Sequence, residues 1–232
     1  MNLSLRLEAV KSTVEPSRVC CDIGCDHGYV SISLINEGLA EHCIACDINE
    51  GPLKAARENI SNAGLSDKIE TRLSDGLHKI DVSDNPDSIV IAGMGGRLMV
   101  KILDEGEAVV NKASQLVLQP QSELFLVRQW VRKKGFFIKN EKIVLDAGKY
   151  YFIMNVSTSG SQEALKEPVP EVYDYYSEYL IKEKNELLRE YLYKGLSNNR
   201  HLLKGISPDK QEGLIKQTEL IETALGLMGE SI

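Results

Sequence analysis

The sequence contains no apolar run near the ~18 residues that a membrane-spanning helix requires. Its first residues also lack the apolar segment of a secretory signal peptide. We therefore expect a cytoplasmic protein without a membrane partner. Positive charge is scarce as well, because 27 Lys and Arg face 34 Asp and Glu, for a net charge of −7. Such a protein has no overall attraction for nucleic acid, so any contact of this kind requires a local basic patch.

Cysteine is absent from most of the chain, and the five cysteines all lie in its first quarter. The spacing Cys43-x-x-Cys46 occurs in zinc sites. These two residues, like Cys20 and Cys21, lie within apolar runs that predict buried central strands. A free thiol in such a strand behaves as a small hydrophobic group. We therefore expect neither a metal site nor a disulfide.

The most informative stretch is 19–29, which predicts a buried strand, a tight glycine turn and the start of a helix. Gly24 and Gly28 mark points where the backbone adopts φ > 0 or approaches another group closely. The start of the helix offers free N–H groups and partial positive charge to an anion. Asp47 ends the next apolar run, where an acid can accept hydrogen bonds from both hydroxyls of a ribose. Together these features predict a nucleoside cofactor.

The acids within this turn indicate which nucleoside is bound. A dinucleotide site has the pattern G-x-G-x-x-G, whereas here Asp26 replaces the middle glycine. A carboxylate repels a pyrophosphate, but Asp22 and Asp26 suit a cofactor that carries an ammonium and a sulfonium. We therefore favour S-adenosylmethionine (SAM) over a dinucleotide. A turn that binds no ligand is the remaining alternative.

Further cofactor candidates follow the second and third predicted strands. Asp75 is placed to accept a hydrogen bond from an adenine amino group, although a surface Asp-Gly turn has the same sequence. The full set of predicted cofactor residues is Asp22, Gly24, Cys25, Asp26, Gly28, Asp47, Ile48, Ser74, Asp75, Gly76 and Gly93.

A second glycine-rich segment, 93–96 (Gly-Met-Gly-Gly), directly follows the predicted strand 86–92. Glycines at the carboxyl end of a central strand let a ligand approach the backbone, and open parallel sheets bind ligands at this edge. We predict that the methyl acceptor meets the cofactor here; a permissive strand-to-helix turn is the alternative. The catalytic candidates are Asp26, Tyr29 and Met94, and the substrate-binding candidates near this segment are Arg6, His27, Gly95 and Gly96.

The densest basic patch lies on a helix predicted for residues 122–134 and on the strand that follows. Its substrate-binding candidates are Arg128, Arg132 and Lys133. Such a run either contacts phosphates or forms a solvated helix face, and both interpretations remain open.

The order of the predicted elements indicates an α/β fold. Five strands alternate with helices, and segments 136–145 and 149–156 predict an antiparallel hairpin at the sheet edge. A seven-stranded sheet with helices on both sides is the Rossmann-like fold of class I SAM-dependent methyltransferases. We assign residues 1–160 to this domain. Residues 161–232 carry apolar stripes that predict a C-terminal helical coiled-coil domain, whose tyrosines we expect to fill the seam rather than stack on bases.

Four segments resemble one family: 3–10 (Leu-Ser-Leu-Arg-Leu-Glu-Ala-Val), 22–29 (Asp-Ile-Gly-Cys-Asp-His-Gly-Tyr), 91–96 (Ile-Ala-Gly-Met-Gly-Gly) and 118–120 (Leu-Gln-Pro). They are similar to the bacterial tRNA (adenine-22-N1)-methyltransferase family, over both predicted domains. The resemblance implies a SAM-dependent Rossmann-like domain, a C-terminal coiled coil and methylation of N1 of an adenine in the tRNA D-arm. Carried over by motif, the residues that would hold SAM are Asp22, Gly24, Asp26, Gly28, Asp47 and Asp75, and segment 93–96 would border the target base.

This reaction needs little catalytic machinery. Adenine N1 carries a lone pair at neutral pH, so positioning in line with the S–CH₃ bond supplies most of the acceleration. The product is cationic, and we expect Asp26 to stabilise it while His27 and Tyr29 orient the base or stack on it. Because N1 is buried in a base pair, the enzyme requires an unpaired or flipped base.

Three other functions remain open: a methyltransferase that acts on a small molecule or a protein, an NAD-dependent oxidoreductase, and a non-catalytic adaptor. Steeply salt-dependent tRNA binding would argue against the first, and a cofactor titration would test the second. The adaptor leaves the glycines of segment 93–96 unexplained. We favour a monomer, although the sequence determines neither the oligomeric state nor the tRNA isoacceptor.

Overall fold

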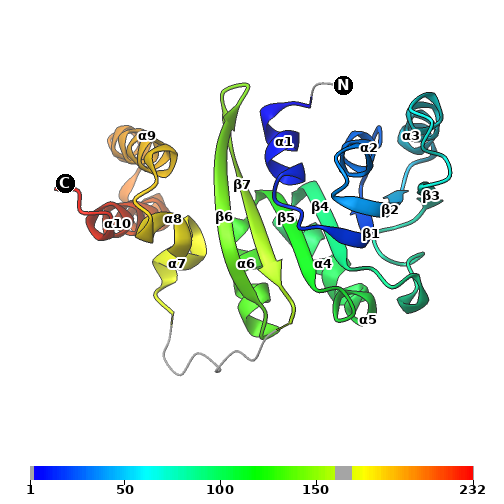
Figure 1. Cartoon of the computed structure of the whole chain (residues 1–232). Helices are drawn as coiled ribbons and strands as arrows, with labels where there is room; N and C mark the ends of the chain where they lie inside the picture. Colours follow the sequence, from blue (N-terminus) through cyan, green and yellow to red (C-terminus); the bar gives the residue numbers. More distant parts are fainter. Residues whose placement is uncertain (1–2, 160–168, 232) are drawn as a thin grey trace. The chain divides into compact units, whose positions relative to one another are not determined.

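The computed structural model describes residues 3–159 and 169–231. Contacts within the chain divide it into two compact units, Met1–Ala164 and Leu165–Ile232, which Figure 1 colours along the sequence. The domain boundary predicted at residues 160–161 lies outside the described residues.

The first unit is built on a seven-stranded sheet with the strand order β3-β2-β1-β4-β5-β7-β6. Strands β1 to β5 are parallel, and β6 and β7 form an antiparallel hairpin at one edge. The strands are β1 (Ser17–Ile23), β2 (Ala40–Asp47), β3 (Ile69–Leu73), β4 (Ser88–Gly95), β5 (Gln115–Ser122), β6 (Phe137–Asp146) and β7 (Lys149–Ser157). This topology confirms the predicted Rossmann-like fold. Because the strand order reverses between β1 and β4, their carboxyl ends form the crevice where such sheets bind ligands.

Helices cover both faces of the sheet (Figure 1). One apolar layer joins α1, α2 and α3 to strand residues such as Cys20 and Val90. The other layer joins α4, α5 and α6 to alternate strand residues such as Cys21 and Ile91. The helices are α1 (Leu5–Lys11), α2 (Tyr29–Asn36), α3 (Glu50–Asn62), α4 (Gly96–Glu105), α5 (Glu107–Val110) and α6 (Leu124–Lys133), with a 3₁₀ turn at Val82–Asp84. The five cysteines are free thiols buried in this unit, as the apolar context of Cys20, Cys21, Cys43 and Cys46 predicted for those four.

Strand β4 ends in a bulge next to β5. Ala92 pairs with Gln119 in regular register. The next pair is Met94 with Pro120, which leaves Gly93 as the extra residue. Gly93 has a φ of +81°, a left-handed conformation that glycine adopts without strain. Because Pro120 has no N–H to donate, the hydrogen-bond ladder is irregular beside the bulge, and the last pair of the two strands is Gly95 with Ser122.

The second unit is helical, as predicted. Its elements are α7 (Glu171–Tyr176), α8 (Glu178–Lys182), α9 (Glu186–Leu203), a 3₁₀ turn (Pro208–Lys210) and α10 (Glu212–Leu227). Helices α9 and α10 pack against each other and bury side chains such as Leu192 and Ile221. Tyr176 packs edge-on against Tyr191 with ring centroids 6.5 Å apart, whereas Tyr193 is exposed, so only part of the tyrosine set fills the core. No helix among the described residues of either unit has the length and apolar character to cross a membrane.

Candidate functional site

The turn after β1 is built from residues in the left-handed region of backbone space. Gly24, Asp26 and Gly28 have φ values of +77°, +51° and +72°. A Cβ atom on Gly24 would meet only Cε of Met94, the end of a flexible side chain, so it is the left-handed conformation that favours glycine here. The Gly24 N–H donates to the Cys46 carbonyl at 2.8 Å, which ties the turn to the end of β2.

A cavity of about 380 Å³ lies against this turn. Asp22 and Asp47 line it from the ends of β1 and β2, and Gly93 lines it from the β4 bulge. The predicted residues that the cavity brings together are Arg6, Asp22, Gly24, Cys25, Asp26, His27, Tyr29, Asp47 and Gly93. The cofactor turn and the start of the second glycine-rich segment therefore share one cavity.

Asp22 is the buried acid of this cavity, with 4% of its surface exposed. The Ser31 hydroxyl donates to Asp22 Oδ2 at 2.7 Å. Burial, with the charge of nearby Asp47, nevertheless raises the Asp22 pKa to about 6. A buried carboxylate is stabilised by an adjacent cation, so this position fits the ammonium group of SAM.

Asp47 ends β2 and orders the loops beside it. Its carboxylate accepts hydrogen bonds from the Asn49 N–H (2.8 Å) and the Asp26 N–H (3.3 Å). An acid at the end of the second strand is the group that accepts ribose hydroxyls in nucleotide-binding Rossmann folds. Asp47 therefore fits the ribose of SAM.

Asp26, His27 and Tyr29 form one side of the cavity. The Asp26 side chain is 71% exposed, and its Oδ1 lies 3.6 Å from His27 Nε2. The rings of His27 and Tyr29 stack, with centroids 5.4 Å apart and planes inclined by 19°. An exposed carboxylate and a flat aromatic surface thus lie together beside the cofactor turn.

Arg6 and Gly93 form another side, and Gln119 connects them. Gln119 is fully buried, and its Oε1 accepts hydrogen bonds from the Gly93 N–H (3.1 Å) and from Arg6 Nη1 (3.0 Å). The Arg6 guanidinium also lies over the Tyr151 ring, 5.6 Å from its centroid. The Arg6 N–H donates to Asp146 Oδ2 at 3.0 Å, which fixes the start of α1 to the hairpin tip. Arg6 is therefore held at the cavity by β5 and by both hairpin strands.

Several lining residues were not identified from the sequence: Leu7, Val30, Asn49, Pro52, Ala92 and Gln121. For Gln121 a signal was present, because it directly follows the Leu-Gln-Pro segment 118–120 that carried part of the resemblance. Leu7 and Ala92 likewise lie within segments 3–10 and 91–96. Val30, Asn49 and Pro52 carry no recognisable motif, and only the fold places them at the cavity.

Other predicted residues lie outside the cavity lining: Gly28, Ile48, Ser74, Asp75, Gly76, Met94, Gly95 and Gly96. Two of them have clear structural roles. The Ser74 hydroxyl donates to the Gly76 carbonyl at 2.9 Å within the turn after β3. A Cβ atom on Gly96 would lie 2.6 Å from the Glu123 carbonyl oxygen, so this glycine lets α4 pack against the end of β5. No group of three or more His, Cys, Asp or Glu in the described parts of the chain is arranged to hold a metal ion.

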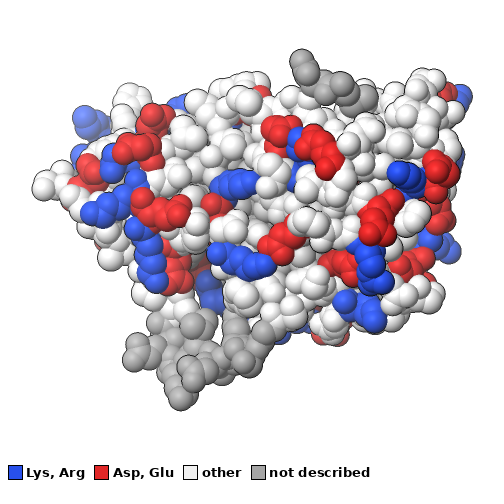
Figure 2. Space-filling model, viewed as in Figure 1, with Lys and Arg blue, Asp and Glu red and all other residues white. Residues whose placement is uncertain are grey.

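Part of the predicted basic patch forms ion pairs within the protein. Arg128 is 1% exposed and binds Glu141 through two hydrogen bonds (3.0 and 2.8 Å), so the prediction that Arg128 contacts substrate is wrong. Lys134 pairs with Asp104 and Glu107, at 3.1 and 2.7 Å. On the face of the first unit that Figure 2 shows, basic and acidic side chains are intermixed. Of the candidates, Arg132 is half-buried and Lys133 is exposed.

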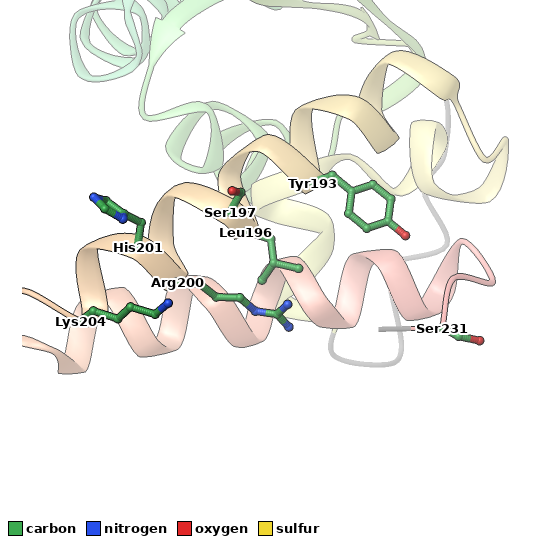
Figure 3. A pocket seen from close by; sticks show the side chains of 7 residues that line it. All are labelled: Tyr193, Leu196, Ser197, Arg200, His201, Lys204 and Ser231. Carbon is green, nitrogen blue, oxygen red and sulfur yellow. The ribbon is translucent and has the colours of Figure 1, made fainter.

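The second unit has a separate basic hollow on α9. Residues 191–208 contain four basic or imidazole side chains and no Asp or Glu, and a cavity of about 580 Å³ lies along them. Figure 3 shows its lining residues, Tyr193, Leu196, Ser197, Arg200, His201, Lys204 and Ser231. Arg200 extends toward α10, where it binds Glu222 at 2.9 Å. His201 and Lys204 are exposed, so they add positive charge to the solvent-facing side of α9 when protonated.

Comparisons with known proteins cover both units of the chain. A family model described as "TrmK: tRNA (adenine(22)-N(1))-methyltransferase" matches residues 20–228. The tRNA (adenine(22)-N(1))-methyltransferase of Bacillus subtilis is 29% identical over 225 residues, which cover 96% of this chain and 94% of that protein.

Solved structures agree with this match. A putative tRNA (m1A22) methyltransferase from Streptococcus pneumoniae is 31% identical, covers 97% of this chain and 100% of its own, and superposes with a TM-score of 0.89. That protein was also solved with S-adenosyl-L-methionine. TrmK of M. capricolum, solved with S-adenosyl-homocysteine, is 26% identical with a TM-score of 0.86, covering 97% and 99% of the two chains. The chain therefore belongs to the TrmK family of tRNA (adenine(22)-N(1))-methyltransferases.

Proposed function

We propose that the protein transfers the methyl group of SAM to N1 of adenine 22 in tRNA. The observation that carries this proposal is the shared cavity at the carboxyl ends of β1 and β4. The side of the cavity with Asp22 and Asp47 fits the cofactor. On the side with Arg6 and Gly93, residue 93 has no side chain to cover its backbone, so the methyl acceptor can approach it. Because tRNA is the proposed substrate, we also propose that the enzyme works in the cytoplasm.

The residues of the cofactor side would bind SAM by complementary charge and hydrogen bonding. Asp22 would pair with the ammonium group and Asp47 with the ribose hydroxyls. Helix α2 begins at Tyr29, and its N-cap residue Gly28 provides no side-chain cap, so the first N–H groups of the helix can receive the carboxylate of the methionine part. Bound SAM supplies a methyl group made electrophilic by the sulfonium.

The remaining task of the protein is to present adenine N1 in line with that methyl group. N1 needs no general base because its lone pair is free at neutral pH, so orientation supplies most of the acceleration. The stacked His27 and Tyr29 rings offer a flat surface for the base. Asp26 places an exposed carboxylate beside the same surface, where it would stabilise the positive charge that develops on the adenine.

The target base must be unpaired, or flipped from its helix, to enter a cavity of this size. Holding the tRNA in that arrangement requires contacts to phosphates. We propose that Arg132 and Lys133 on α6 supply some of them, and that the α9 hollow supplies others.

The test is methyl transfer from labelled SAM to an unmodified tRNA transcript, with a transcript that carries guanine at position 22 as the control. N1 methylation blocks the Watson–Crick edge, so reverse transcriptase stops at the modified base. We expect incorporation with a stop at adenine 22 and none in the control. No incorporation, with SAM binding intact, would overturn the proposal and point to a small-molecule or protein acceptor.

A further inference from the structure

Gln121 is a polar side chain on the side of the cavity that we assign to the methyl acceptor. It lines the cavity, it is exposed, and its side-chain amide has no hydrogen-bond partner within the described parts of the chain. Gln119, two residues earlier on β5, is the opposite case. It is fully buried, accepts from Gly93 and Arg6, and donates from Nε2 to the Pro120 carbonyl at 3.1 Å. The hydrogen-bonding groups of Gln119 are therefore used within the protein, whereas those of Gln121 can bind a ligand.

The Gln121 amide and the Arg6 guanidinium both lie close to Gly93. A Cβ atom built on Gly93 would lie 3.7 Å from Gln121 Nε2 and 3.6 Å from Arg6 Nη1. Since residue 93 has no side chain, this space stays open above the backbone of the bulge. The same cavity continues to the cofactor side at Asp22 and Asp47. Gln121 therefore lies within reach of an acceptor that also approaches the cofactor.

We propose that Gln121 selects the target base by pairing with the N6–N7 edge of the adenine. This inference rests on the proposed function, because it assumes that adenine N1 faces the cofactor. An adenine in that orientation presents its N6 amino group as a donor and N7 as an acceptor on the edge next to N1. A glutamine amide matches both groups at once, Oε1 accepting from N6–H and Nε2 donating to N7.

The same pairing disfavours the other purine. Guanine presents two acceptors, O6 and N7, on this edge, so Gln121 Oε1 would face an acceptor instead of a donor. The Arg6 guanidinium is held in place by Gln119 and Tyr151. The Gln121 amide is therefore the group beside Gly93 that is left to pair with the base. Gln121 is thus a specificity-determining residue, distinct from the groups that bind the cofactor.

The test combines a change in the protein with a change of one atom in the RNA. A tRNA ligated from synthetic fragments carries 7-deazaadenine at position 22, which keeps N1 and N6 and replaces only N7 by C–H. Methylation rates are measured for the original chain and for Gln121→Leu on both RNAs, with SAM affinity from calorimetry as the check on folding. Asn111→Leu, which likewise replaces an exposed amide by leucine, at a position after α5 outside the cavity lining, is the control.

We expect kcat/KM of the original chain to fall about 3- to 10-fold on the 7-deaza RNA, the range for the loss of one of the two hydrogen bonds. Gln121→Leu should lose about 10- to 100-fold on normal RNA, the range of the whole bidentate contact, and should methylate the two RNAs at similar rates. Asn111→Leu should behave as the original chain. Independent, multiplying losses, or equal rates of the original chain on both RNAs, would overturn the inference. If the original chain fails to methylate adenine 22 of normal tRNA, the proposed function itself is wrong.

Discussion

At the scale of single residues, the ionisation of Asp22 in the cofactor site makes the stability of the fold depend on pH. Its folded pKa of about 6 lies above the ordinary value of 3.8, because burial disfavours the ionised form. The folded state therefore binds more protons than the unfolded state between these two values. The contribution of Asp22 to the stability of the ligand-free protein is therefore fully present below pH 4 and is lost as the pH rises through 6.

We expect this loss to be about 3 kcal/mol, and Asp22→Asn to remove it. Urea unfolding of the ligand-free protein between pH 4 and 7 measures the effect. SAM should bind better as Asp22 ionises, so its affinity should rise through pH 6 and become flat and weaker in Asp22→Asn. A stability profile that Asp22→Asn leaves unchanged would contradict the assignment.

Asp26 has a different predicted role, and its backbone determines which variant is informative. Because its φ is +51°, Asp26→Asn keeps a residue that tolerates the left-handed region, whereas alanine strains the turn. We expect Asp26→Asn to lower kcat about 100-fold with tRNA and SAM affinities nearly unchanged, since only the developing charge loses a partner. Single-turnover rates and equilibrium binding measure the two separately. An unchanged kcat would remove Asp26 from the mechanism.

At the scale of elements, the buried pair Arg128–Glu141 joins α6 to β6. Removing one partner leaves an uncompensated buried charge, so Arg128→Met should destabilise the protein by about 3–5 kcal/mol. Arg128→Met with Glu141→Leu should recover most of that loss, because both charges are gone. Urea unfolding at neutral pH measures both variants. If Arg128→Met unfolds normally but binds tRNA weakly, the arginine acts on RNA instead.

The same pair illustrates what the sequence can predict. Local patterns identified the strands, the cofactor turn and the tail helices, because periodicity and glycine positions are properties of neighbouring residues. Glu141 lies on another element, so nothing near Arg128 indicated that its charge was already paired. Gly96 was assigned to the substrate for a similar reason, although its close neighbour is the Glu123 backbone. Gln121 was missed because its place in the site becomes apparent only beside Arg6, and Arg6 reaches β5 only in the folded chain, through α1.

At the scale of the whole molecule, tRNA binding must come from a few local basic surfaces, since the net charge is −7. Lys204→Gln in the α9 hollow tests whether the second unit takes part. We expect weaker tRNA binding and a salt dependence of the binding constant reduced by about one unit of slope, because one phosphate contact is lost. Lys182→Gln, which removes a lysine already paired with Glu178, is the matched control. An unchanged salt slope for Lys204→Gln would place the RNA elsewhere.

Alkylation of the cysteines in the central strands can also show how often the sheet of this protein opens. Burial raises the thiol pKa of Cys21 in β1 well above the usual range, and that of Cys46 in β2 to about 12. An alkylating reagent needs an accessible thiolate, so we expect the folded chain to resist it. Modification followed by mass spectrometry therefore measures how often the centre of the sheet separates, with no dye attached. Rapid labelling in the folded state would instead mean that β1 and β2 part without global unfolding.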